Sequence, residues 1–208
     1  MKPEADAFYP IIIGVGGTAR RRSSSECAVA HALHAAKALG ARTILFDGEF
    51  VSRLPLYLPG ERVPTPNEEI FIEAIRTCHG VIVGTPSYHG SLSGPIKNVL
   101  DLIEDTAKDR RPYLDGRAFG CVVTAAGWQG CGTTLVSLRT IAHALRAWPT
   151  PFGATLNASV PMFDVNGVCM DSKAAEQLAV VARQVVEFAR CRDALRSLMP
   201  SVSDKQTA

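Results

Sequence analysis

The fold is decided by residues 81–98, which read VIVGTPSYHGSLSGPIKN. The β-branched run at 81–83 is too short for a helix and too apolar for a surface, so it predicts a buried parallel strand. Thr85-Pro86 is expected to end that strand, and Ser93 and Pro95 supply the N-cap and first turn of a helix. Ligands of open α/β sheets bind beyond the carboxyl ends of the strands. The aromatic, histidine and glycine residues at this edge suit a flat ring better than a phosphate, although an ordinary strand-to-helix connection could also contain them.

The rest of the chain repeats this alternation of strand and helix. Strands that alternate with helices imply an α/β fold, a doubly wound parallel sheet with helices on both faces. Five strands fit a flavodoxin-like order better than a six-stranded dinucleotide-binding fold. The expected strands are residues 11–15, 43–46, 81–83, 119–124 and 151–156; the expected helices are 26–39, one capped by Asn67 and reaching Cys78, 95–104, 133–147 and 172–198.

Composition narrows the function classes. The chain has 208 residues, of which 47% are hydrophobic and 20% charged, and this suits one domain over 1–208 with an ordered core at about 10–198 and frayed ends. A net charge of +2 gives no reason to expect a nucleic-acid partner. Because neither a membrane-spanning stretch nor a signal peptide is visible, we expect a cytoplasmic protein. The six cysteines form no CxxC pair and no zinc-ligand spacing, so we expect no metal site.

A second loop follows the first predicted strand, where residues 14–25 read GVGGTARRRSSS. Glycines let a backbone approach an anion, hydroxyls donate to phosphate oxygens, and a helix N-terminus adds its amides and dipole. Neither GxGxxG nor GKS/GKT is present, so the loop predicts a mononucleotide phosphate site, with an exposed turn as the alternative. The candidate residues are Gly16, Thr18, Arg20, Arg22, Ser23, Ser24 and Ser25. The sequence leaves open which of the three consecutive arginines contacts the phosphate.

A third loop, TAAGWQGCG at 124–132, follows another buried strand. Its glycines allow tight turns that leave backbone amides free to hydrogen-bond the carbonyls of a ring. Cys131 lies near a helix start, where thiol pKa values fall, but we do not count it as catalytic. No catalytic residue is predicted, because no nucleophile, base and acid can be assembled from the spacing. The candidates for cofactor binding are Thr124, Ala125, Gly127, Trp128, Gln129 and Gly130.

Residues 85–98 resemble the second flavin-contacting loop of the NADPH-dependent FMN reductase family, because its Pro, Tyr, Ser-Gly and Lys-Asn positions fall in register. Residues 14–25 resemble the family's phosphate loop, with Gly17 where a serine is expected, and the resemblance covers about residues 10–190. Leu54-Pro55-Leu56-Tyr57 resembles a family segment that lies near a neighbouring subunit's flavin. The resemblance implies a homodimer or homotetramer, and isoalloxazine contacts by Pro86, Ser87, Tyr88, His89, Gly90 and Ser91.

These features together predict an NAD(P)H-dependent FMN reductase. FMN and NADPH or NADH are the expected cofactors, because a flavin carries the hydride chemistry that the side chains lack. The partners would be a small-molecule acceptor or a flavin-dependent monooxygenase. One alternative is an FMN-bound quinone, azo or metal-oxyanion reductase. The other is a flavodoxin-type electron carrier without turnover, which is disfavoured because such carriers are usually strongly acidic and this chain carries +2.

Overall fold

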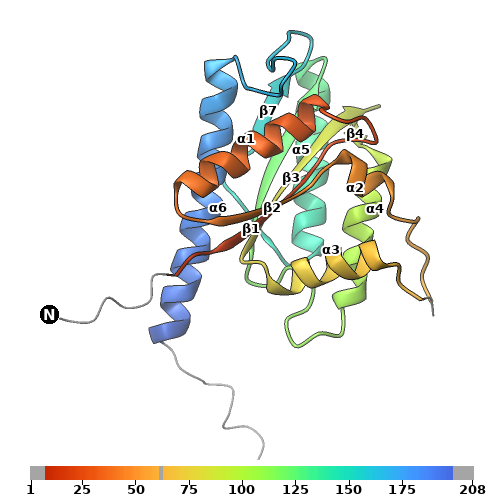
Figure 1. The fold of residues 1–208 in the computed structure, drawn as a ribbon, viewed down its shortest axis with the longest axis vertical. Coiled ribbons are helices and arrows are strands. Elements are labelled where there is room, and N and C mark those ends of the chain that lie inside the picture. Colours follow the sequence, from red (N-terminus) through yellow and green to blue (C-terminus); the bar gives the residue numbers. More distant parts are fainter. Residues whose placement is uncertain (1–7, 61–62, 199–208) are drawn as a thin grey trace, which may run out of the picture.

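A computed structural model describes residues 8–60 and 63–198 (Figure 1). Strands and helices alternate along the chain as expected. The strands are β1 (Ile11–Gly16), β2 (Arg42–Phe46), β3 (Gly80–Tyr88), β4 (Ser91–Leu92), β5 (Ala118–Ala125), β6 (Trp148–Pro149) and β7 (Ala154–Asn157). The helices are α1 (Ser24–Ala38), α2 (Gly48–Ser52), α3 (Pro66–Thr77), α4 (Gly94–Leu102), the 3-10 helix η1 (Ile103–Thr106), α5 (Trp128–Ala144) and α6 (Ser172–Leu198).

The central sheet has the order β2-β1-β3-β5-β6, with all of these pairs parallel. β6 pairs with the start of β5 and β7 with its end, so these two short strands share the fifth position of a flavodoxin-like sheet. Pro151 contributes to the interruption because it cannot donate to a ladder. Arg139 Nη2 donates to the Pro151 carbonyl at 2.7 Å within this break. The five-stranded order is confirmed, but the fifth position is split: β6 lies before the predicted strand at 151–156, and only β7 overlaps it.

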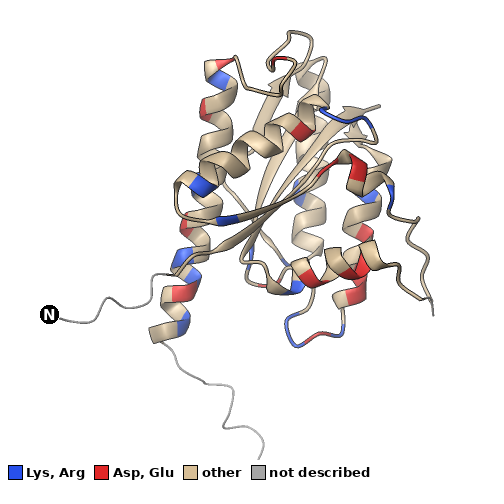
Figure 2. Ribbon diagram, viewed as in Figure 1, with Lys and Arg blue, Asp and Glu red and all other residues tan. Residues whose placement is uncertain are grey.

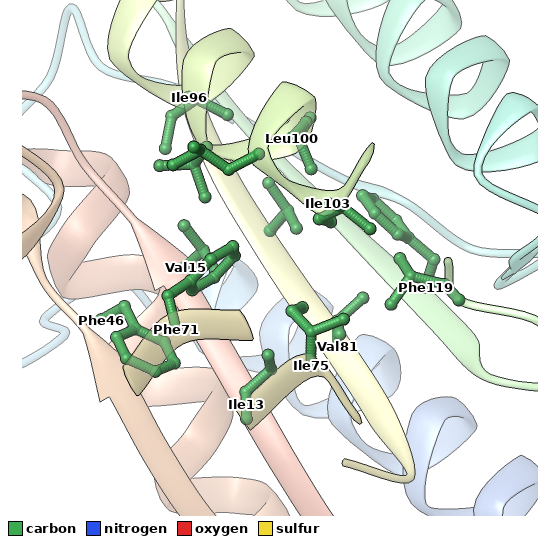
Figure 3. Close-up of a cluster of buried hydrophobic side chains, with 14 of the residues drawn as sticks. Ile13, Val15, Phe46, Phe71, Ile75, Val81, Ile96, Leu100, Ile103 and Phe119 are labelled. Carbon is green, nitrogen blue, oxygen red and sulfur yellow. The ribbon is translucent and has the colours of Figure 1, made fainter. Parts of the chain in front are cut away.

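Helices cover both faces of the sheet (Figure 1). On one face, α1 and α6 pack against each other and against β1, β3 and β5. On the other face, side chains from α3, α4 and α5 meet the opposite side of the same strands. Figure 3 shows this second cluster, in which Phe71 and Ile75 of α3 face Phe46, Ile13 and Val81 of the sheet. Burial on both faces explains why the central strands read as continuous apolar runs.

Capping sets where α3 begins. The expected N-cap, Asn67, lies inside the helix, and Thr65 occupies that position instead. Thr65 and Glu68 form a capping box in which each side chain accepts from the other residue's backbone amide. Pro66 fits the first turn because its missing N–H would have no helical partner. The prediction for Asn67 was wrong because the earlier Thr-Pro pair supplies the stronger start signal.

Most of the ends predicted to fray lie outside the described residues. Phe8 is described, and its ring meets the His79 ring edge-on with centroids 4.9 Å apart. No helix within 8–60 or 63–198 is long and apolar enough to cross a membrane.

Candidate functional site

A cleft lies at the carboxyl ends of β1, β3 and β5, where the three predicted loops meet. Its volume is about 470 Å³. The flavodoxin-like sheet creates this crevice because the chain leaves β1 and β3 toward opposite faces. Its walls are formed by Thr18, Arg20, Arg22, Ser23, Ser24, Ser25, Pro86, Ser87, Tyr88, Thr124, Ala125, Ala126 and Ala158.

The polar end of the cleft is the connection from β1 to α1. Gly17 has a φ of 106° and Arg22 a φ of 53°, so the chain turns sharply twice before the helix. Ser23 is the N-cap of α1, and its Oγ accepts from the Glu26 amide at 3.3 Å. The Ser23 and Ser25 hydroxyls lie 3.3 Å apart. Hydroxyls and helix-terminal amides at a dipole's positive end form an environment that stabilises an anion.

The structure separates the three arginines of this loop. Arg20 lines the cleft, and its guanidinium has no hydrogen bond or ion pair with any residue that the structure describes. Arg21 lies outside the cleft lining, and its Nε is 3.4 Å from Glu49 Oε2 of α2. Arg22 lines the cleft but donates through Nη1 to the Val165 carbonyl at 2.8 Å. Arg20 is therefore the cation most available to a ligand at this end.

The segment at 85–91, which was expected to be a loop, is more regular than expected. β3 continues through Pro86 and Ser87 to Tyr88, because Pro86 still pairs with β5 through the register of the ladder. His89 and Gly90, with φ values of 53° and 81°, form the two-residue turn of a hairpin between β3 and β4. Pro86, Ser87 and Tyr88 line the cleft, whereas His89, Gly90 and Ser91 do not.

Helix α5 begins earlier than the predicted start at about residue 133. Gly127 is its N-cap, so Trp128, Gln129 and Gly130 are helical rather than loop residues, and none of the four lines the cleft. Thr124 and Ala125 do line it. A Cβ at Gly130 would lie 3.0 Å from Ser87 Oγ, so glycine permits the close approach of α5 to β3.

Two lining residues were missed by sequence reasoning. Ala126 belongs to the third loop, and Ala158 follows β7, where its amide donates to the Ala125 carbonyl at 2.7 Å. Neither small apolar side chain gives a chemical signal in the sequence. Gly16 does not line the cleft, and a Cβ there would lie 3.0 Å from Val29 Cβ, so glycine lets α1 pack closely on the end of β1.

One thiol, that of Cys131, lies in the first turn of α5. Cys131 is buried, and burial raises the pKa of its thiol, opposite to the lowering that a helix start favours. Within the described part of the chain, no three His, Cys, Asp or Glu residues group to hold a metal ion. The residues fit FMN, since a cationic, hydroxyl-rich end adjoins a wall of strand-end backbone.

A larger hollow lies elsewhere, beside α3, with a volume of about 670 Å³. Its charged lining is mainly acidic, with Glu68, Glu69, Glu73 and Asp105 against Arg76. Such a lining would repel a phosphorylated ligand. The cleft at the sheet edge is the better candidate although it is smaller.

The sequence is similar to those of known proteins. A family model described as NADPH-dependent FMN reductase matches residues 10–159. An NAD(P)H-dependent FAD/FMN reductase of Geobacillus thermodenitrificans is 26% identical over 134 residues, 64% of this chain and 68% of that protein.

Solved structures with the same fold include the flavoenzyme NAD(P)H:(acceptor) oxidoreductase FerB of Paracoccus denitrificans. It has a TM-score of 0.68 and 16% identity, and the match covers 89% of this chain and 99% of that one. An NADH:FMN oxidoreductase in its apo form has a TM-score of 0.62 and 20% identity, over 88% and 89% of the two chains. The family match confirms an oxidoreductase that uses FMN and a nicotinamide nucleotide. The chain belongs to the NADPH-dependent FMN reductase family.

Proposed function

We propose that the cleft binds FMN with its phosphate at the β1–α1 connection and its isoalloxazine ring along the ends of β3 and β5. The observation that carries this proposal is the polarity of the cleft. Arg20 and the hydroxyls of residues 23–25 lie at one end, and strand-end backbone and small side chains form the rest. This arrangement matches a ligand that has a dianion at one end and a flat ring at the other.

FMN, when bound, supplies hydride transfer between a nicotinamide nucleotide and an acceptor. The chain's own residues bind and orient it. Arg20 and the serines at the start of α1 hold the phosphate, while the backbone of 86–88 and 124–126 holds the ring edge. Ser87 is fixed by a hydrogen bond of 2.8 Å from Thr134 Oγ1 of α5, which sets the position of the β3 end. Tyr88 is 54% exposed, so its ring is available to a second flat molecule beside the flavin.

The acceptor distinguishes two forms of this function. In the first, FMN is itself reduced and released, for a flavin-dependent monooxygenase or another acceptor. In the second, FMN stays bound and a quinone, azo compound or metal oxyanion is reduced. The half-exposed Tyr88 is consistent with both. Family membership makes an electron carrier without turnover the weakest interpretation.

We also propose a single-domain, cytoplasmic protein that forms a homodimer or homotetramer. The segment after α2 supports self-association. Asn98 of α4 accepts from the Tyr57 amide at 2.7 Å and donates to the Pro55 carbonyl at 2.9 Å, so the segment is fixed. Leu56 and Leu58 nevertheless remain 73% and 63% exposed. Light scattering at working concentration should report more than one chain per particle, and a monomer would contradict this assignment.

Steady-state oxidation of NADPH and NADH tests the function directly. The assay is run in parallel with free FMN, a quinone and an azo dye. Turnover with free FMN alone identifies a flavin reductase, and turnover with another acceptor at catalytic FMN identifies a bound-flavin reductase. No nucleotide oxidation under any condition would refute the proposal.

A further inference from the structure

Glu26 of α1 connects two segments that border the cleft. Its Oε1 accepts from the Arg22 amide at 3.1 Å, and its Oε2 accepts from the Gly48 amide at 3.0 Å. Its own amide donates to Ser23 Oγ at 3.3 Å. One side chain thus fixes the β1–α1 connection to the first residue of α2. Figure 2 shows the basic β1–α1 connection and the acidic start of α2 in this part of the molecule.

The loop needs such a support because its backbone is unusual. Arg22 has a φ of 53°, in the left-handed region that non-glycine residues seldom occupy. The hydrogen bond from its amide to a carboxylate helps to offset that cost, since hydrogen bonds to charged groups are stronger than neutral ones. The same bond sets where the Arg22 side chain leaves the loop.

The contact between the β1–α1 connection and α2 also depends on one residue, Gly48. A Cβ at Gly48 would lie 2.0 Å from the Thr18 carbonyl oxygen and 3.0 Å from Glu26 Oε2. Only glycine allows α2 to approach the loop this closely. The carboxylate therefore occupies a tight junction between the loop and α2.

We propose that Glu26 is a positioning residue that holds the phosphate end of the cleft in its binding conformation. This inference rests on the proposed function. A carboxylate near a phosphate site opposes anion binding by its charge. Both Glu26 oxygens, however, accept hydrogen bonds from backbone amides, and Arg20 and Arg22 add two positive charges to the cleft. The order that Glu26 imposes on the loop outweighs the repulsion, and it favours phosphorylated flavin over riboflavin.

The test compares Glu26→Gln with Glu49→Gln by calorimetry of FMN and riboflavin binding. Glutamine keeps one acceptor oxygen, but its side-chain NH₂ would face the other backbone amide. FMN affinity of Glu26→Gln should fall by about tenfold or more, since a charge-assisted hydrogen bond is lost, while riboflavin affinity should change by less than about threefold. Glu49→Gln removes a nearby charge that pairs with Arg21 and Arg53, outside the cleft, and should leave both affinities unchanged.

Amide hydrogen exchange provides a readout that does not depend on flavin. In Glu26→Gln, exchange should be faster at residues 17–25 and 48–50 and unchanged in α3, with thermal unfolding recorded to confirm the fold. Unchanged exchange in the loop, or tighter FMN binding by the variant, would overturn the positioning role. A wild-type protein that binds no flavin would refute the proposed function, yet faster exchange in the variant would still support the junction.

Discussion

Replacing Arg20 with alanine should separate phosphate recognition from ring recognition. Arg20 lines the cleft, and its guanidinium has no hydrogen bond or ion pair within 8–60 and 63–198, so the substitution breaks no such bond of the described fold. A hydrogen bond to a charged group contributes about 1.5–3 kcal/mol. Since about 1.4 kcal/mol corresponds to a factor of ten, FMN affinity should fall roughly 10- to 150-fold. Riboflavin has no phosphate, so its affinity should stay within about twofold of the wild type.

Arg21→Ala is the matched control for this prediction. Its side chain is 80% exposed, and it forms an exposed ion pair with Glu49, at 3.4 Å. Exposed ion pairs contribute about 0–1 kcal/mol to stability, and Arg21 is outside the cleft lining. Calorimetry of all three proteins with both ligands gives the comparison. Equal losses of FMN and riboflavin in Arg20→Ala, or an equal loss of FMN in Arg21→Ala, would refute the assignment of Arg20.

Three further substitutions and one labelling experiment test other parts of the site. Ser23→Ala should lower the free energy of unfolding by about 1 kcal/mol, because it removes the α1 N-cap, and urea denaturation should measure this loss. The same substitution should lower the affinity for FMN more than that for riboflavin, as calorimetry would show. An unchanged free energy of unfolding would argue against the cap. Tyr88→Ala should change acceptor preference with little effect on FMN affinity, and His89→Ala should change neither. Stopped-flow reduction and reoxidation measure these steps. A changed acceptor preference in His89→Ala and none in Tyr88→Ala would contradict the prediction. Because burial raises the pKa of Cys131, iodoacetamide should label it more slowly at neutral pH than the exposed Cys191, and faster labelling in a peptide map would contradict its burial.

The order of elements could be predicted because the central strands carry a strong local signal. Val81, Ile82 and Val83 are buried on both faces of the sheet, so their apolar run stands out in the sequence. The three-loop arrangement follows from that order, since parallel strands deliver their carboxyl ends to one edge. Several serine and arginine residues before α1, predicted to form an anion site, do line the cleft.

The exact ends of the strands and helices around the site could not be predicted, because they depend on tertiary contacts that are not visible in the local sequence. Pro86 was expected to stop β3, yet the strand continues because its ladder with β5 extends to this residue. The glycines after β5 indicated a loop, but Gly127 caps a helix and Gly130 gives Ser87 room. The different roles of the three arginines were invisible for the same reason, because Val165 lies far along the chain from Arg22.

Titration of the purified protein with FMN tests the central claim most directly. We predict saturable binding of one FMN per chain, seen as heat in calorimetry and as a change in the flavin absorbance spectrum. Riboflavin should bind more weakly because the cationic end of the cleft would have no phosphate to hold. No binding of FMN at high micromolar concentration would contradict the account, as would riboflavin binding as tight as that of FMN.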